Sequence, residues 1–143
     1  MRDLLHNVGI VGAIAPAVLD ADNTPAAIDL LGFDSAVVVL HVGVGGITFT
    51  TSNKIEFKLT HSDDDVSYTA VALEDVLGLT SVGSGGIIHA LTAAHAAPSV
   101  KKVGYVGGKR YLKLLADFSG THSTGTPISA TVIKGHAASR PVS

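Results

Sequence analysis

Several residue types are absent from this 143-residue chain or scarce in it. It has no cysteine and no tryptophan, and only 15% of its residues are charged. Without cysteine there can be no disulfide framework, no thiolate nucleophile and no cysteine-ligated zinc. Ten basic and twelve acidic residues give a net charge of −2, which is not typical of nucleic-acid-binding proteins. The hydrophobic fraction of 46% is normal for one folded domain. With so few charged residues, part of the surface has to be apolar, which predicts that partners cover some of it.

Long hydrophobic runs are also missing. The apolar stretch at residues 8–19 is too short to cross a bilayer as a helix, which takes about 20 residues. Arg2 before it and Ala13-Ile14-Ala15 within it imitate a signal peptide, but Pro16 after the would-be cleavage site disfavours cleavage. We therefore expect a first β-strand that ends near Asp20, in a soluble protein synthesised in the cytoplasm and making no membrane contact.

The rest of the chain alternates between strand-like and turn-like segments. Residues 54–60 alternate apolar and polar side chains, which predicts a strand with one solvated face. Residues 35–42 are apolar and β-branched on both faces, which predicts a central strand covered on both sides. Further strand-like segments are 26–33, 47–50, 66–73, 100–106, 110–117 and 128–134, and helical turns are expected only within 73–77 and 89–97.

Short strands separated by turns rich in glycine, serine and aspartate are typical of all-β folds. The sequence predicts a single-domain antiparallel β-sandwich, jelly-roll-like, of about eight short strands. The domain spans residues 1–143, and extended arms are expected at 1–7 and 137–143.

Motifs for catalysis or cofactor binding are incomplete. The glycine clusters at 43–46 and 83–86 lack the third glycine and the helix of a dinucleotide-binding loop, so we interpret them as turns. The acidic run 61–65 lacks the alternating ligands of a calcium loop and predicts a hairpin turn, with adventitious Ca²⁺ as the alternative. Seven histidines occur without metal-site spacing, and His41, in the most apolar strand, is expected to be a hydrogen-bonded core residue. There is no Gly-x-Ser-x-Gly elbow. We expect no enzymatic activity, no cofactor and no metal; a metal site built from distant histidines is the alternative.

One basic and aromatic segment remains. Lys101 and Lys102 precede residues 105–111, in which tyrosines flank Lys109 and Arg110. Such a segment could bind phosphates and stack bases, or its tyrosines could cover a sheet while the lysine and arginine stems lie over it. Because the chain is net negative, we favour the second interpretation and expect no direct nucleic-acid contact.

Several short motifs follow one another along the chain. They are Pro16-Ala-Val-Leu19 with Ala26-Ala-Ile-Asp-Leu-Leu-Gly-Phe-Asp-Ser35, Lys58-Leu-Thr-His-Ser-Asp-Asp-Asp65, Asp75-Val-Leu-Gly78, Val103-Gly-Tyr-Val-Gly-Gly-Lys-Arg-Tyr-Leu-Lys113, Lys134-Gly-His136 and Arg140-Pro-Val142. Together these segments resemble small structural proteins of tailed bacteriophages and prophages, of the capsid cement or decoration type. The resemblance covers roughly residues 16–142, and Asp65 stands where the family usually has glycine.

The resemblance implies a protein on the capsid exterior of a virion. Such a protein binds the major capsid protein, bridges neighbouring subunits and stabilises the head by surface complementarity, and a homo-oligomer (dimer or trimer) is expected. The alternative is a head-fibre or tail-associated protein that could bind a glycan. Apolar residues near the N-terminus, the C-terminal tail and the basic pair are the candidate partner contacts: Leu4, Leu5, Val8, Ile10, Val11, Lys109, Arg110, Arg140, Pro141 and Val142.

Overall fold

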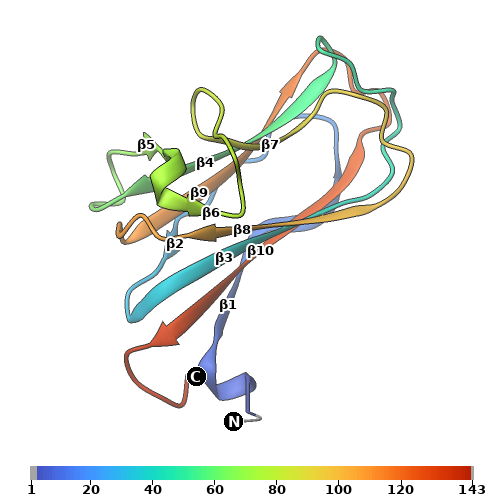
Figure 1. The fold of residues 1–143 in the computed structure, drawn as a ribbon. Helices are drawn as coiled ribbons and strands as arrows, with labels where there is room; N and C mark the ends of the chain where they lie inside the picture. The colour runs from blue at the N-terminus through green and yellow to red at the C-terminus, as the bar shows by residue number, and fades with distance from the viewer. Residues whose placement is uncertain (1–2, 143) are drawn as a thin grey trace.

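The computed structural model describes residues 3–142 and consists almost entirely of strands and loops (Figure 1). Two 3₁₀ turns, η1 (Leu5–Asn7) and η2 (Leu73–Asp75), are its only helical segments within that range, and neither is long and apolar enough to cross a membrane. The strands are β1 (Gly9–Leu19), β2 (Ile28–Asp29), β3 (Phe33–Val42), β4 (Lys54–Ser62), β5 (Thr69–Ala70), β6 (Val76–Leu77), β7 (Ile87–Leu91), β8 (Ser99–Tyr105), β9 (Tyr111–Ser119) and β10 (Thr126–Ala137).

The strands form two antiparallel sheets. Sheet A has the order β1-β10-β3-β8-β6, and sheet B has the order β2-β9-β4-β5, with β7 also paired to β4. Strands β5 and β7 pair with different parts of β4 and so share one position in sheet B. The strands pair from the two ends of the chain toward its middle: β1 pairs with β10, β2 with β9, β3 with β8, and β4 with β7. This nesting is the jelly-roll topology, with eight main strand positions, and it confirms the predicted sandwich.

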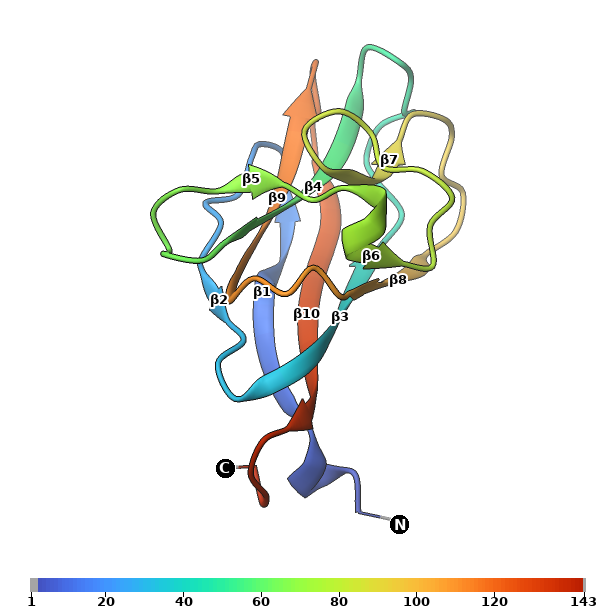
Figure 2. The ribbon, with the colours of Figure 1, turned by 60° about the vertical axis from the view of Figure 1, so that its left-hand side comes forward.

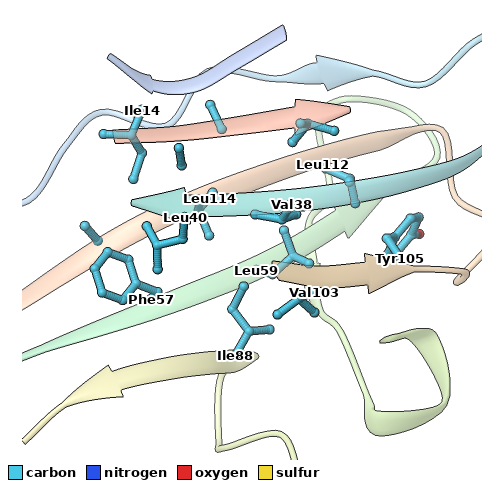
Figure 3. Packing of buried hydrophobic residues seen from close by; sticks show 14 of the residues in the cluster. Ile14, Val38, Leu40, Phe57, Leu59, Ile88, Val103, Tyr105, Leu112 and Leu114 are labelled. Carbon is cyan, nitrogen blue, oxygen red and sulfur yellow. The ribbon is translucent and has the colours of Figure 1, made fainter. Parts of the chain in front are cut away.

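The core lies between the two sheets and follows the period of two along each strand. In sheet A, Val132, Val38 and Val103 are direct cross-strand neighbours on the inner face. Phe57 and Leu114 face them from sheet B, and all of these side chains are buried (Figure 3). Each side chain therefore meets neighbours both within its sheet and across the sandwich, which gives one continuous core.

Three expected strands are much shorter than their sequence pattern indicates, or are absent. Residues 26–33 contribute the two-residue strand β2 and the first residue of β3, and within residues 66–73 only β5 is a strand. Residues 47–50 form a loop, although Phe49 is buried, because its ring fills the end of the core without the chain joining a sheet. The helical turn expected within 89–97 is wrong, since His89 lies in β7.

Side chains replace a strand along one edge of β9. Asn23 accepts a hydrogen bond from the backbone of Ala116 at 2.7 Å and donates one to the carbonyl of Leu114 at 3.2 Å. Asp22 accepts from the backbone of Phe118 at 2.7 Å. Because these side chains satisfy the edge of β9, the segment before β2 needs no regular pairing of its own.

Candidate partner-binding surfaces

The predicted N-terminal and C-terminal contact residues lie together at one end of the sandwich (Figures 1 and 2). The carboxylate of Asp3 accepts the backbone N–H of His6 at 3.2 Å and lies 2.7 Å from its Nδ1, which holds the η1 turn. The backbone N–H of Val142 donates to the carbonyl of His6 at 3.0 Å. The two terminal segments are therefore joined by a direct hydrogen bond. Residues 1, 2 and 143 of the expected arms lie outside the described residues.

Two leucines at this end are open to solvent. Leu4 is 69% exposed and Leu5 is 77% exposed. Beside them, Leu4, Val8 and Arg140 line a shallow hollow of about 400 Å³ between η1 and the end of β10. Arg140 is exposed and makes no ion pair with any residue in the described range. Exposed apolar groups next to an unpaired guanidinium are the chemistry of a protein–protein contact.

Ile10 and Val11 point to opposite faces of β1. Ile10 pairs with Ile133 and is 68% exposed on the outer face of sheet A. Val11 pairs with Val132 and packs against the core. Of these two candidate contacts, the structure leaves Ile10 open to a partner.

Lys109 and Arg110 lie elsewhere, in the turn between β8 and β9. Arg110 donates two hydrogen bonds to the carboxylate of Asp29, at 2.9 and 2.8 Å. This bidentate contact is the main reason why the pKa of Asp29 falls to about 2. Lys109 Nζ lies 3.6 Å from a carboxylate oxygen of Asp63. Both cations thus have carboxylate partners within the chain.

The same turn borders a cleft of about 360 Å³. Its walls are the turn between β2 and β3, the start of β3 at Phe33 and Asp34, and the turn carrying Lys109 and Arg110. Within residues 3–142, no group of three or more histidine, aspartate or glutamate side chains is placed to hold a metal ion.

A buried polar pair supports the floor of this cleft. His61 is 6% exposed, and its Nδ1 lies 2.9 Å from the hydroxyl of Tyr105, which accepts the backbone N–H of Lys109 at 3.1 Å. Burial lowers the pKa of His61, although the nearby carboxylate of Asp75 opposes the change. The lowered pKa favours the neutral imidazole, which can accept a hydrogen bond from the hydroxyl of Tyr105. His41, which the sequence placed in the core, is exposed on the outer face of sheet A, so that interpretation was wrong.

The acidic run 61–65 ends β4 and begins the hairpin turn to β5, as its sequence indicates. The Oδ1 atom of Asp64 accepts the backbone N–H groups of Val66 at 2.9 Å and Ser67 at 2.8 Å, together with the hydroxyl of Ser62 at 2.8 Å. These hydrogen bonds lower the pKa of Asp64 to about 2. Asp65 has a φ angle of +59°, in the left-handed region.

Sequence reasoning missed one surface, the outer face of sheet A. It interpreted residues 35–42 as a strand covered on both sides, but within the described chain only the inner face is covered. Val37 and Val39 lie on the uncovered face, between neighbours that are buried. The unbroken apolar pattern of this strand was the signal, and it indicated a covering that this chain does not itself supply.

Comparisons with family models and with curated proteins found no match for this chain. Among solved structures, the SPBc2 prophage-derived protein YomS is similar over 90% of this chain and 92% of its own, with 11% identity and a TM-score of 0.49. A chain from Bacillus endospore appendages, described as disulfide-linked pili, is similar over 97% of both chains, with 13% identity and a TM-score of 0.39. At these values the function of this chain has to be argued from its own residues.

Proposed function

We propose that this chain is a structural protein of a bacteriophage virion, namely a capsid decoration protein. It binds the exterior of the major capsid shell, bridges neighbouring capsid subunits and stabilises the head. Its work is surface complementarity, so it needs no catalytic group or cofactor.

The observation that carries this proposal is the backbone at the motifs of the phage resemblance. Asp65, which stands where the family usually has glycine, adopts the left-handed conformation that favours glycine, with a φ angle of +59°. Three other motifs contain a left-handed glycine: Gly32 at +84°, Gly78 at +88° and Gly108 at +72°. The resemblance therefore falls on the positions that shape the turns of the jelly roll, and a turn pattern matched in this way supports a shared fold.

The end that carries both termini suits attachment to a protein lattice. Leu4 and Leu5 supply exposed apolar surface, and Arg140 supplies a cation without an ion-pair partner among residues 3–142. Many such contacts around a capsid add up, so that each one can be modest in strength.

A density map of the virion is the test of location. We expect jelly-roll density on the outer surface of the head, in contact with the major capsid protein. Density on the tail or on head fibres would assign the alternative role, and absence of the chain from purified particles would refute both.

A pair of variants tests the attachment surface. Replacing both Leu4 and Leu5 by glutamate should lower the occupancy on purified heads, because two charges would have to be buried in the contact. Val66→Glu is the matched control, since Val66 is 82% exposed but lies in the turn after β4, away from the terminal segments. Equal occupancy for the double variant and the control would exclude the leucines as contacts.

A further inference from the structure

The outer face of sheet A is almost free of charge. Each row of cross-strand neighbours on this face follows from the strand register. Two neighbouring rows each cross β1, β10, β3 and β8 in that order. The first row is Ile10–Ile133–Val37–Gly104, and the second row is Gly12–Thr131–Val39–Lys102. Leu77 of β6 extends the first row beyond Gly104. In these two rows, only Lys102 carries a charge.

The outer face of sheet B is the opposite. Lys54 and Glu56 form an ion pair at 2.5 Å on β4, and Lys58 pairs with Asp117 across β4 and β9. Lys113 lies over the ring of Tyr68. Sheet B thus has the charged outer face expected of a sheet in contact with water, whereas sheet A does not. The two faces belong to one small domain, so overall composition does not explain the difference.

We propose that the outer face of sheet A binds the same face of a second copy of this chain. The overlap spans four strands, about 19 Å across, and the seven residues of β8, about 24 Å along the strands. Each copy then contributes roughly 450 Å², or about 900 Å² in total, which is the size of a weak and reversible interface. The inference is independent of the virion assignment, because it concerns a different surface and the chain alone.

The sequence of each row is self-complementary. When the two-fold axis runs along the strands, between β10 and β3, each row lies over the same row of the second copy read in the opposite direction. Ile10 then lies over Gly104 of the second copy, and Ile133 lies over Val37 of the second copy. Ile10 thus meets an apolar surface formed by Gly104 and the side chain of Leu77, since a Cβ atom built on Gly104 would lie 3.1 Å from the Cβ atom of Leu77.

The same arrangement accommodates the one charge. Lys102 lies over Gly12 of the second copy, and a Cβ atom built on Gly12 would meet nothing within 4 Å, so there is space for the lysine stem. Lys102 and Gly12 belong to β8 and β1, the outermost strands of the four-strand overlap. The ammonium group therefore reaches solvent at the rim, and the two copies of Lys102 lie on opposite sides of the interface.

Sedimentation equilibrium of the full chain across the micromolar range tests this interface. We expect the mass to rise with concentration from 14.5 kDa toward twice that value. Val39→Glu should weaken the dimer by more than about 10-fold, because its carboxylate would be buried in the middle of the overlap against Thr131 of the second copy, with Lys102 as its only charged neighbour in the row. Leu115→Glu is the matched control and should dimerise like the wild type, since Leu115 is a half-buried apolar residue on the outer face of sheet B. Thr131→Lys repeats the test if Val39→Glu does not fold.

A monomeric wild type, or a Val39→Glu variant that folds and dimerises like the control, would overturn the proposal. So would a monomeric wild type whose Val39→Glu variant no longer binds capsids, because the face would then belong to the capsid contact. Failure of the chain to bind capsids at all would instead refute the proposed function, while leaving the dimer measurement intact.

Cysteine crosslinking tests the direction of the axis in a chain that has no natural cysteine. A mixture of Ile133→Cys and Val37→Cys proteins should crosslink with a short bismaleimide better than either protein alone. If Ile133→Cys alone crosslinks as well as the mixture, β10 lies over β10 of the second copy and the proposed position of the two-fold axis is wrong.

Discussion

The hydroxyl of Tyr105 joins three parts of the structure through one buried atom. It lies 2.9 Å from Nδ1 of His61 in β4 and accepts the backbone N–H of Lys109 in the turn after β8. The simplest proton arrangement has the hydroxyl donating to Nδ1 while its oxygen accepts from Lys109. Tyr105→Phe removes this atom and keeps the ring, so the packing of the core around it is preserved.

The expected cost follows from what is left without a partner. His61 and Tyr105 are 6% and 3% exposed, so water does not replace the lost hydroxyl freely. A buried group left without its hydrogen bond costs about 1–3 kcal/mol. We therefore expect the free energy of unfolding to fall by about 2 kcal/mol, and the midpoint of thermal unfolding by about 6–8 °C in a domain of this size.

Urea denaturation at pH 7 measures the change, and a second tyrosine provides the control. Tyr111 is half-buried on β9, and its hydroxyl makes no hydrogen bond within the described part of the chain. Tyr111→Phe should therefore change stability by less than about 0.5 kcal/mol. If Tyr105→Phe were no more destabilising than Tyr111→Phe, the hydroxyl would contribute nothing and the reasoning would be refuted.

Three further predictions concern the stability of variants in two turns and the pH dependence of stability. Gly86→Ala should lower the midpoint of thermal unfolding far more than Gly108→Ala. Both glycines have a positive φ angle, so the backbone strain is similar in the two variants. However, a Cβ atom on Gly86 would lie 2.3 Å from the carbonyl oxygen of Leu59, whereas a Cβ atom on Gly108 would meet nothing within 4 Å. Asp65→Ala should be less stable than Asp65→Gly by about 1 kcal/mol in urea, because φ is +59° there, and equal values would contradict this. Burial lowers the pKa of His61, so on acidification the unfolded chain binds this proton before the folded chain does. The free energy of unfolding should therefore keep its full value above about pH 6.5 and decrease as the pH falls below it. In His61→Gln this decrease, measured by urea denaturation at several pH values, should be smaller.

The long strands could be predicted from the sequence because their side-chain pattern and their burial have the same cause. Residues 54–60 alternate because β4 has the core on one side and water on the other, and the structure places Ile55 and Phe57 in the core as the pattern requires. The short strands could not be predicted in this way. The segment before β2 is held by the side chains of Asp22 and Asn23 on β9, contacts across more than ninety positions that no local pattern contains.

The candidate surfaces were predicted less completely, for the same reason. The sequence indicated both terminal segments as contact regions, but their meeting through the hydrogen bond from Val142 to His6 depends on β1 and β10 being neighbours in sheet A. Likewise, the carboxylate partner of Arg110 is Asp29, which only the pairing of β2 with β9 brings close. Local patterns predict which residues face outward, whereas topology decides which of them meet.

The hydrogen bond between Val142 and His6 also keeps the two terminal segments of the chain close together in space. A short glycine-rich linker could join the two terminal segments, and new ends could be opened in the exposed loop between β7 and β8. Such a circular permutant would keep every strand pair of the jelly roll while carrying its free termini, and any fused cargo, at a different place on the surface. The two terminal segments would then form an ordinary loop, with Leu4 and Leu5 still exposed at the same end of the sandwich as Arg140.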